Sequence, residues 1–126
     1  MVICDTKSQR ELAGSAYGER RAQCEEGARL LGVSALRAVT PGQFAARGPA
    51  LPPLVAKRCR FIIEEHARVY ALAEALAAGD RMALHRLTAA SFDGACRLYE
   101  IATPAMRAMM NATILVKSPL VKNCLT

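Results

Sequence analysis

Apolar residues return every three or four positions along most of the chain, which is the spacing of α-helices. The longest such stretch, residues 54–78, predicts the longest helix, and we expect it to be the spine of the fold. Ile63 and Tyr70 widen its apolar face, and Gly79 follows as the expected terminator. Its inner stripe, close to heptad spacing, comprises Val55, Cys59, Ile62, His66, Val69, Ala73 and Leu76.

Another helix is predicted ahead of this spine. It begins near residues 8–10, or nearer Ser15, because Gly14 and Gly18 weaken the first turns. Gly32 is a favourable residue just past its C-terminus. The face that recurs at helical spacing comprises Tyr17, Cys24, Ala28 and Leu31.

Cap signals place the remaining helices. Thr40 and Gln43 form a capping box for a short helix, and residues 34–39 before it are a connector anchored by Leu36. Asp80 caps a helix over residues 81–98. The inner face expected there comprises Leu84, Leu87, Ser91, Ala95 and Leu98, with Gly94 as a close-packing point or kink.

The two ends of the chain differ from its middle. Residues 1–4 are apolar with two β-branched members, which predicts a short strand that needs pairing partners. Thr103 and Pro104 cap a last helix over residues 105–116. We therefore predict a mainly α fold, one short N-terminal strand followed by a bundle of about four helices.

Composition narrows the classes of partner. The chain has 126 residues, 52% of them hydrophobic, which suits one domain with its own core. The net charge of +6 permits an anionic partner, but acidic and basic residues alternate, so a solvated basic surface is favoured over a nucleic-acid interface. No apolar stretch approaches the roughly 20 residues that cross a bilayer, and no signal peptide is expected. We predict a cytoplasmic protein that binds neither nucleic acid nor membrane.

The sequence shows no complete catalytic or metal-binding constellation. The five cysteines are not spaced as zinc ligands or as a disulfide framework, so we expect reduced and mostly buried thiols. There is no glycine-rich phosphate loop and no Ser/His/Asp set. We therefore predict no catalytic residue and no metal site in this segment.

Tyr17 is the strongest candidate for binding. A phenol near a helix start offers an apolar face and a hydroxyl, which together suit a sugar; the alternative is a partly buried core tyrosine. Arg20 and Arg21 are able to bind phosphate. Alternatively, Arg21 pairs with Glu25 one helical turn away.

An ordered set of motifs runs through most of the chain. The opening one has the form Arg-Glu-Leu, then Ser-x-Tyr-x-x-Arg-Arg-x-x-Cys-Glu, over residues 10–25. Later members are Lys57, Arg58, Cys59, Arg60, Ile62, Ile63, Glu65, Tyr99, Glu100, Ile101, Thr103 and Pro104. In this order the motifs resemble the galactokinases of the GHMP kinase superfamily. The likeness spans about residues 1–110, and residues 111–126 form a divergent tail.

The resemblance implies an α+β parent fold and an ATP-dependent sugar 1-kinase using Mg²⁺. In that family the tyrosine matching Tyr17 contacts galactose, and we carry Arg10, Arg20 and Arg21 as secondary candidates. The family's ATP loop and catalytic aspartate match nothing in this sequence, so we expect a segment that is inactive alone. The family usually has His where Phe61 stands, which leaves the sugar open.

A second hypothesis is a non-catalytic helical module, with an interaction or regulatory role, derived from the same fold. If the chain is instead a segment of the kinase, apolar faces made to pack on other elements of that enzyme are expected to be exposed and to favour self-association.

Overall fold

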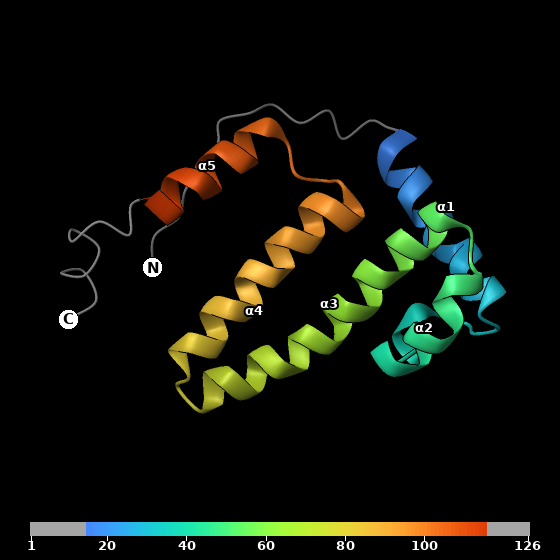
Figure 1. The fold of residues 1–126 in the computed structure, drawn as a ribbon, viewed down its shortest axis with the longest axis horizontal. Coiled ribbons are helices and arrows are strands. Elements are labelled where there is room, and N and C mark those ends of the chain that lie inside the picture. Colours follow the sequence, from blue (N-terminus) through green and yellow to red (C-terminus); the bar gives the residue numbers. More distant parts are fainter. Residues whose placement is uncertain (1–14, 116–126) are drawn as a thin grey trace. The chain divides into compact units, whose positions relative to one another are not determined.

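The computed structural model describes residues 15–115, and within this range the chain is helical with no strand (Figure 1). The predicted mainly α class is thereby confirmed for the described residues, whereas the strand predicted at residues 1–4 lies outside them. The helices are α1 (Ser15–Leu30), α2 (Pro41–Arg47), α3 (Pro53–Ala77), α4 (Arg81–Gly94) and α5 (Pro104–Leu115), with short helical turns at Leu36–Ala38, Gly48–Ala50 and Ala95–Tyr99.

Residues 15–100 of the described range form one compact unit, called the helical unit below, and α5 belongs to another. The Thr103 hydroxyl accepts a hydrogen bond from the Met106 amide at 3.2 Å, which confirms the predicted cap of α5. This helix continues past residue 110, where the family likeness ends, so the boundary between segment and tail stays a prediction. No helix between residues 15 and 115 is long and apolar enough to cross a bilayer.

Local signals end α1 and α3 and begin α2 and α4 as predicted. Gly32 has a φ of +68°, and the amide of Val33 reaches back to the Ala28 carbonyl at 3.0 Å, which closes α1. Gly79 ends α3 with a φ of +66° in the same way. At the start of α2, Thr40 and Gln43 form both hydrogen bonds of the capping box, and the Asp80 carboxylate caps α4.

The core lies where α1, the Leu36 turn and α2 pack on the first half of α3. Gly27 allows α1 to approach α3 closely, since a Cβ there would lie 2.0 Å from the Cys59 sulfur. The buried cluster comprises Ala28, Leu31, Leu36, Val39, Leu51, Cys59 and Ile63.

The stripe predicted for the spine is wrong in its second half. Val69 is 58% exposed and Leu76 is 61% exposed, while Ala75 is buried. The reason is that α3 changes partners along its length: its first half contacts α1, and its second half runs antiparallel to α4 (Figure 1). One straight stripe cannot face two partners on different sides of the helix.

The helix predicted over residues 81–98 ends earlier than expected. α4 stops at Gly94, residues Ala95–Tyr99 form a wider π-helical turn, and Glu100 takes the left-handed conformation with a φ of 58°. Gly94 is a close-packing point as predicted, since an added Cβ would lie 2.9 Å from the Phe61 ring. Of the predicted inner face, Leu84, Leu87, Ser91, Ala95 and Leu98 are only partly buried.

Candidate functional site

An open groove of about 640 Å³ lies within the helical unit and carries the best candidate for binding. Its walls come from the exposed side of α1, the connector after Gly32, one residue of α3 and the π-helical turn. The lining residues are Tyr17, Arg21, Cys24, Glu25, Ala28, Arg29, Val33, Ser34, Ala35, Leu36, Arg37, Ile62 and Tyr99.

Tyr17 lines this groove and is 72% exposed. The alternative of a partly buried core tyrosine is therefore wrong. Tyr17 lies in the first turn of α1, whereas the buried residues Ala28 and Leu31 belong to its other end, so the phenol extends beyond the core. Its ring and hydroxyl are available to a ligand.

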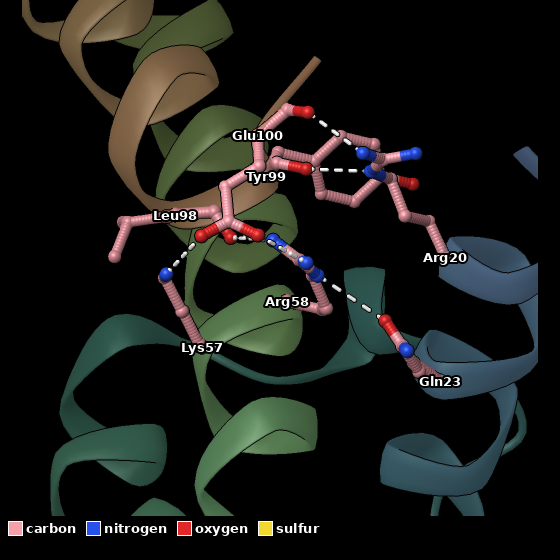
Figure 2. A network of polar contacts seen from close by, with 7 residues as sticks. All are labelled: Arg20, Gln23, Lys57, Arg58, Leu98, Tyr99 and Glu100. Carbon is pink, nitrogen blue, oxygen red and sulfur yellow. Dashed lines mark hydrogen bonds and ion pairs between the residues drawn. The ribbon is translucent and has the colours of Figure 1, made fainter. Parts of the chain in front are cut away.

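The two candidate arginines of α1 have protein partners. Arg21 donates to Glu25 at 2.8 Å, which confirms the predicted ion pair; both side chains are exposed, so the pair contributes little stability. Arg20 donates to the backbone carbonyls of Tyr99 and Glu100, each at 2.7 Å (Figure 2). Its fork thus links α1 to the end of the π-helical turn. Arg10 lies outside the described residues.

Arg58 donates three hydrogen bonds within the helical unit, and this role was not predicted. It is only 6% exposed and projects from α3 between α1 and the π-helical turn (Figure 2). Its guanidinium donates to the Leu98 carbonyl at 2.6 Å, to the Glu100 carboxylate at 2.6 Å and to the Gln23 amide oxygen at 3.2 Å. This buried cation is tolerated because each of its three guanidinium nitrogens donates to an acceptor.

Glu100 receives two cations on one carboxylate. One oxygen accepts from Lys57 and the other from Arg58. These hydrogen bonds, first from Lys57 and then from Arg58, lower the pKa of Glu100 to about 2. The set of Arg20, Gln23, Lys57, Arg58 and Glu100, called the clamp below, holds the left-handed backbone at residue 100 in place.

The clamp predicts a specific acid sensitivity. Because the pKa of Glu100 is lower in the folded than in the unfolded chain, the unfolded chain takes up this proton first. The clamp's contribution to the free energy of unfolding is therefore full above about pH 5 and is lost as the pH falls towards about 2. We expect the stability gap between wild type and Glu100→Gln, measured by denaturant unfolding, to narrow across this range. A gap that is constant with pH would contradict the assignment.

Tyr99 lines the groove, and the clamp holds its backbone in place. Its ring stacks on Phe61 with centroids 4.9 Å apart, and its side chain lies near the Cys24 thiol. Tyr99 was part of the family likeness but was not predicted as a site residue. Only the folded chain brings it beside Tyr17, because the two are far apart in sequence.

Two cysteine thiols lie at the groove or close to it. Burial raises the pKa of Cys24, and burial raises that of Cys59 to about 12, so neither thiol is an activated nucleophile at neutral pH. Among the described residues no group of three His, Cys, Asp or Glu is placed to hold a metal. The single lining carboxylate, Glu25, is already paired, so the groove does not fit Mg²⁺.

No model of a known protein family matches the chain. The likeness to galactokinases therefore rests on the residues quoted above and stays a prediction, as do the ATP and Mg²⁺ that it implies. The groove, which both Tyr17 and Tyr99 line, is where experiments can test that prediction.

Proposed function

We propose that this chain is the helical segment of a galactokinase-type sugar 1-kinase, a cytoplasmic enzyme that transfers phosphate from ATP to galactose or a related sugar. The Tyr17 groove forms one wall of its sugar site. The observation that carries this proposal is the exposed phenol of Tyr17 in a groove lined by hydroxyl, guanidinium and carboxylate groups. A sugar presents both apolar ring faces and hydroxyls, and this lining offers a partner for each.

In this proposal, the described residues do not carry out the phosphoryl-transfer step. ATP and Mg²⁺ bind, in this proposal, to parts of the enzyme that match the family's upstream and downstream motifs, which this sequence lacks. The residues described here bind and orient the sugar, and the chain alone does not phosphorylate it. Affinity for the sugar is correspondingly weak, with a Kd of about 1 mM or higher, because one open wall makes few contacts.

Tyrosine substitution tests the proposed sugar wall. In a titration of the ¹⁵N-labelled chain with galactose, we expect amide shifts in α1 and the connector after Gly32, and we expect Tyr17→Ala to abolish them. Tyr70→Ala is the matched control, because Tyr70 is 61% exposed on α3 and does not line the groove. Shifts that survive Tyr17→Ala, or that are lost equally with Tyr70→Ala, would remove Tyr17 from the sugar site.

The alternative is a non-catalytic interaction or regulatory module, which would bind its partner through an exposed apolar face. Val69 and Leu76 leave such a face on the second half of α3, and Met82 is exposed on α4. Self-association through this face would give concentration-dependent shifts on α3 and α4 that Tyr17→Ala does not alter. Such shifts without any galactose-dependent shift in α1 would favour the module over the sugar site.

A further inference from the structure

The groove beside Tyr17 carries a positive charge that a neutral sugar does not require. Three guanidinium groups and one carboxylate line it, and a second carboxylate, Glu26, pairs with one of the three, which leaves a net formal charge of +1. The cations are Arg21 and Arg29 of α1 and Arg37 of the Leu36–Ala38 turn, and the anion is Glu25.

Arg37 differs from the other two arginines. Arg21 pairs with Glu25 at 2.8 Å, and Arg29 pairs with Glu26 at 2.7 Å. No hydrogen bond or ion pair of the Arg37 side chain is found within the part of the chain that the structure describes, and the residue is exposed. Among residues 15–115, no carboxylate pairs with this guanidinium of the groove.

The backbone that carries Arg37 is firmly placed. Leu36 before it is buried in the core, and so is Val39 two residues after it. The Val39 amide donates to the Leu36 carbonyl at 3.0 Å, which closes the turn. Arg37 is therefore presented at the groove from a fixed turn, and its side chain remains able to adjust to a ligand.

The rest of the lining fits the ring of a sugar bearing an anion. Tyr17 and Tyr99 supply aromatic surface, and Ser34 supplies a hydroxyl. A guanidinium binds a carboxylate or a phosphate through two parallel N–H donors, which neutral hydroxyls do not match. The lining thus contains a partner for a ring and a partner for a negative group.

We propose that the Tyr17 groove binds an anionic sugar, a hexose that carries a carboxylate or a phosphate, and that Arg37 contacts its anionic group. This inference rests on the proposed sugar-binding function and specifies its ligand class. The two sources of charge, a uronate and a sugar phosphate, share the chemistry that the groove recognises.

Four ligands and two variants test the inference on the full 126-residue chain. The ¹⁵N-labelled protein is titrated with galactose, galacturonate, galactose 6-phosphate and inorganic phosphate at one ionic strength. We expect one or both anionic sugars to bind about tenfold more tightly than galactose, as one charged hydrogen-bonded contact provides. Arg37→Gln should reduce their affinity to that of galactose and leave galactose binding unchanged. Arg81→Gln, which changes an exposed arginine of α4 outside the groove, should have no effect.

The outcomes separate this inference from the proposed function. Galactose shifts that depend on Tyr17, with anionic sugars binding no more tightly, overturn the inference and leave the function standing. Tighter binding of anionic sugars that Arg37→Gln does not weaken also overturns it. Inorganic phosphate that binds as tightly as the anionic sugars overturns the assignment of a sugar ligand. Binding that Arg37→Gln weakens but Tyr17→Ala does not would instead contradict the proposed function, because it would show that Tyr17 does not contact the ligand.

Discussion

Replacing Gly27 with alanine is expected to destabilise the helical unit by about 2–3 kcal/mol, because it overpacks the contact between α1 and α3. The added Cβ would lie 2.0 Å from the Cys59 sulfur and 3.1 Å from a methyl carbon of Val55. Cys59 has no exposed surface, so its sulfur has no free space to enter. The two helices must therefore separate or Cys59 must take a strained rotamer.

The same substitution elsewhere in α1 has the opposite sign. Gly18 has no atom within 4 Å of an added Cβ, so Gly18→Ala should stabilise the chain by about 0.5–1 kcal/mol through helix propensity. Denaturant unfolding of both variants measures the contrast. In a double-mutant cycle, Cys59→Ala should recover most of the loss caused by Gly27→Ala, since it removes the clashing sulfur. A Gly27→Ala variant as stable as Gly18→Ala would show that α1 does not contact α3 as described.

Replacing Arg58 with alanine is expected to cost about 2–4 kcal/mol of unfolding free energy. The Leu98 carbonyl and the Gln23 amide lose their donor, and the turn that carries Tyr99 is released from α3. The cost stays below that of a fully buried ion pair because the Glu100 side chain is 45% exposed and keeps Lys57.

Two further variants, one at residue 58 and one at residue 60, control for charge and for helix propensity. Arg58→Lys keeps the charge but loses the planar guanidinium with its several donors. Its unfolding free energy should therefore lie between those of wild type and Arg58→Ala. Arg60→Ala removes an exposed arginine that pairs with Glu64 on the same helix, and its effect should stay within about 0.5 kcal/mol. Equal losses for Arg58→Ala and Arg60→Ala would contradict the clamp.

The parts of the fold that the sequence predicts well are those with a local cause. Gly32 and Gly79 end helices because only a residue without a Cβ takes a positive φ at little cost. The position of a glycine after an apolar helical pattern is visible in the sequence itself. Thr40 and Asp80 cap helices through partners three residues away. Such signals do not depend on what else packs nearby.

The failures have a non-local cause. The burial of Arg58 depends on Leu98 and Glu100, which lie 40 and 42 residues further along the chain. The carbonyl of Leu98 that accepts from Arg58 belongs to the π-helical turn, where a continuous α-helix was expected. The available signal was an arginine directly beside Cys59, a residue of the predicted inner stripe, but this neighbour does not by itself indicate burial.

The sequence predicted part of the lining of the candidate groove. Tyr17 was proposed because its chemistry and the family likeness agree, and the Arg21 ion pair follows from helical spacing. Tyr99 and Arg37 were not identified as site residues, because their place at the groove arises only when the π-helical turn and the connector fold against α1. Their residue types carry no such information by themselves.

The proposed kinase function is tested by placing this segment in a complete enzyme of the galactokinase type. Residues 15–100 replace the equivalent segment, and the KM for the sugar is measured with and without Tyr17→Phe. We expect an active chimera in which Tyr17→Phe raises the sugar KM by about 2- to 12-fold, the equivalent of one hydrogen bond of about 0.5–1.5 kcal/mol, and leaves the KM for ATP unchanged. A folded chimera without kinase activity, or one whose sugar KM does not respond to Tyr17→Phe, would contradict it.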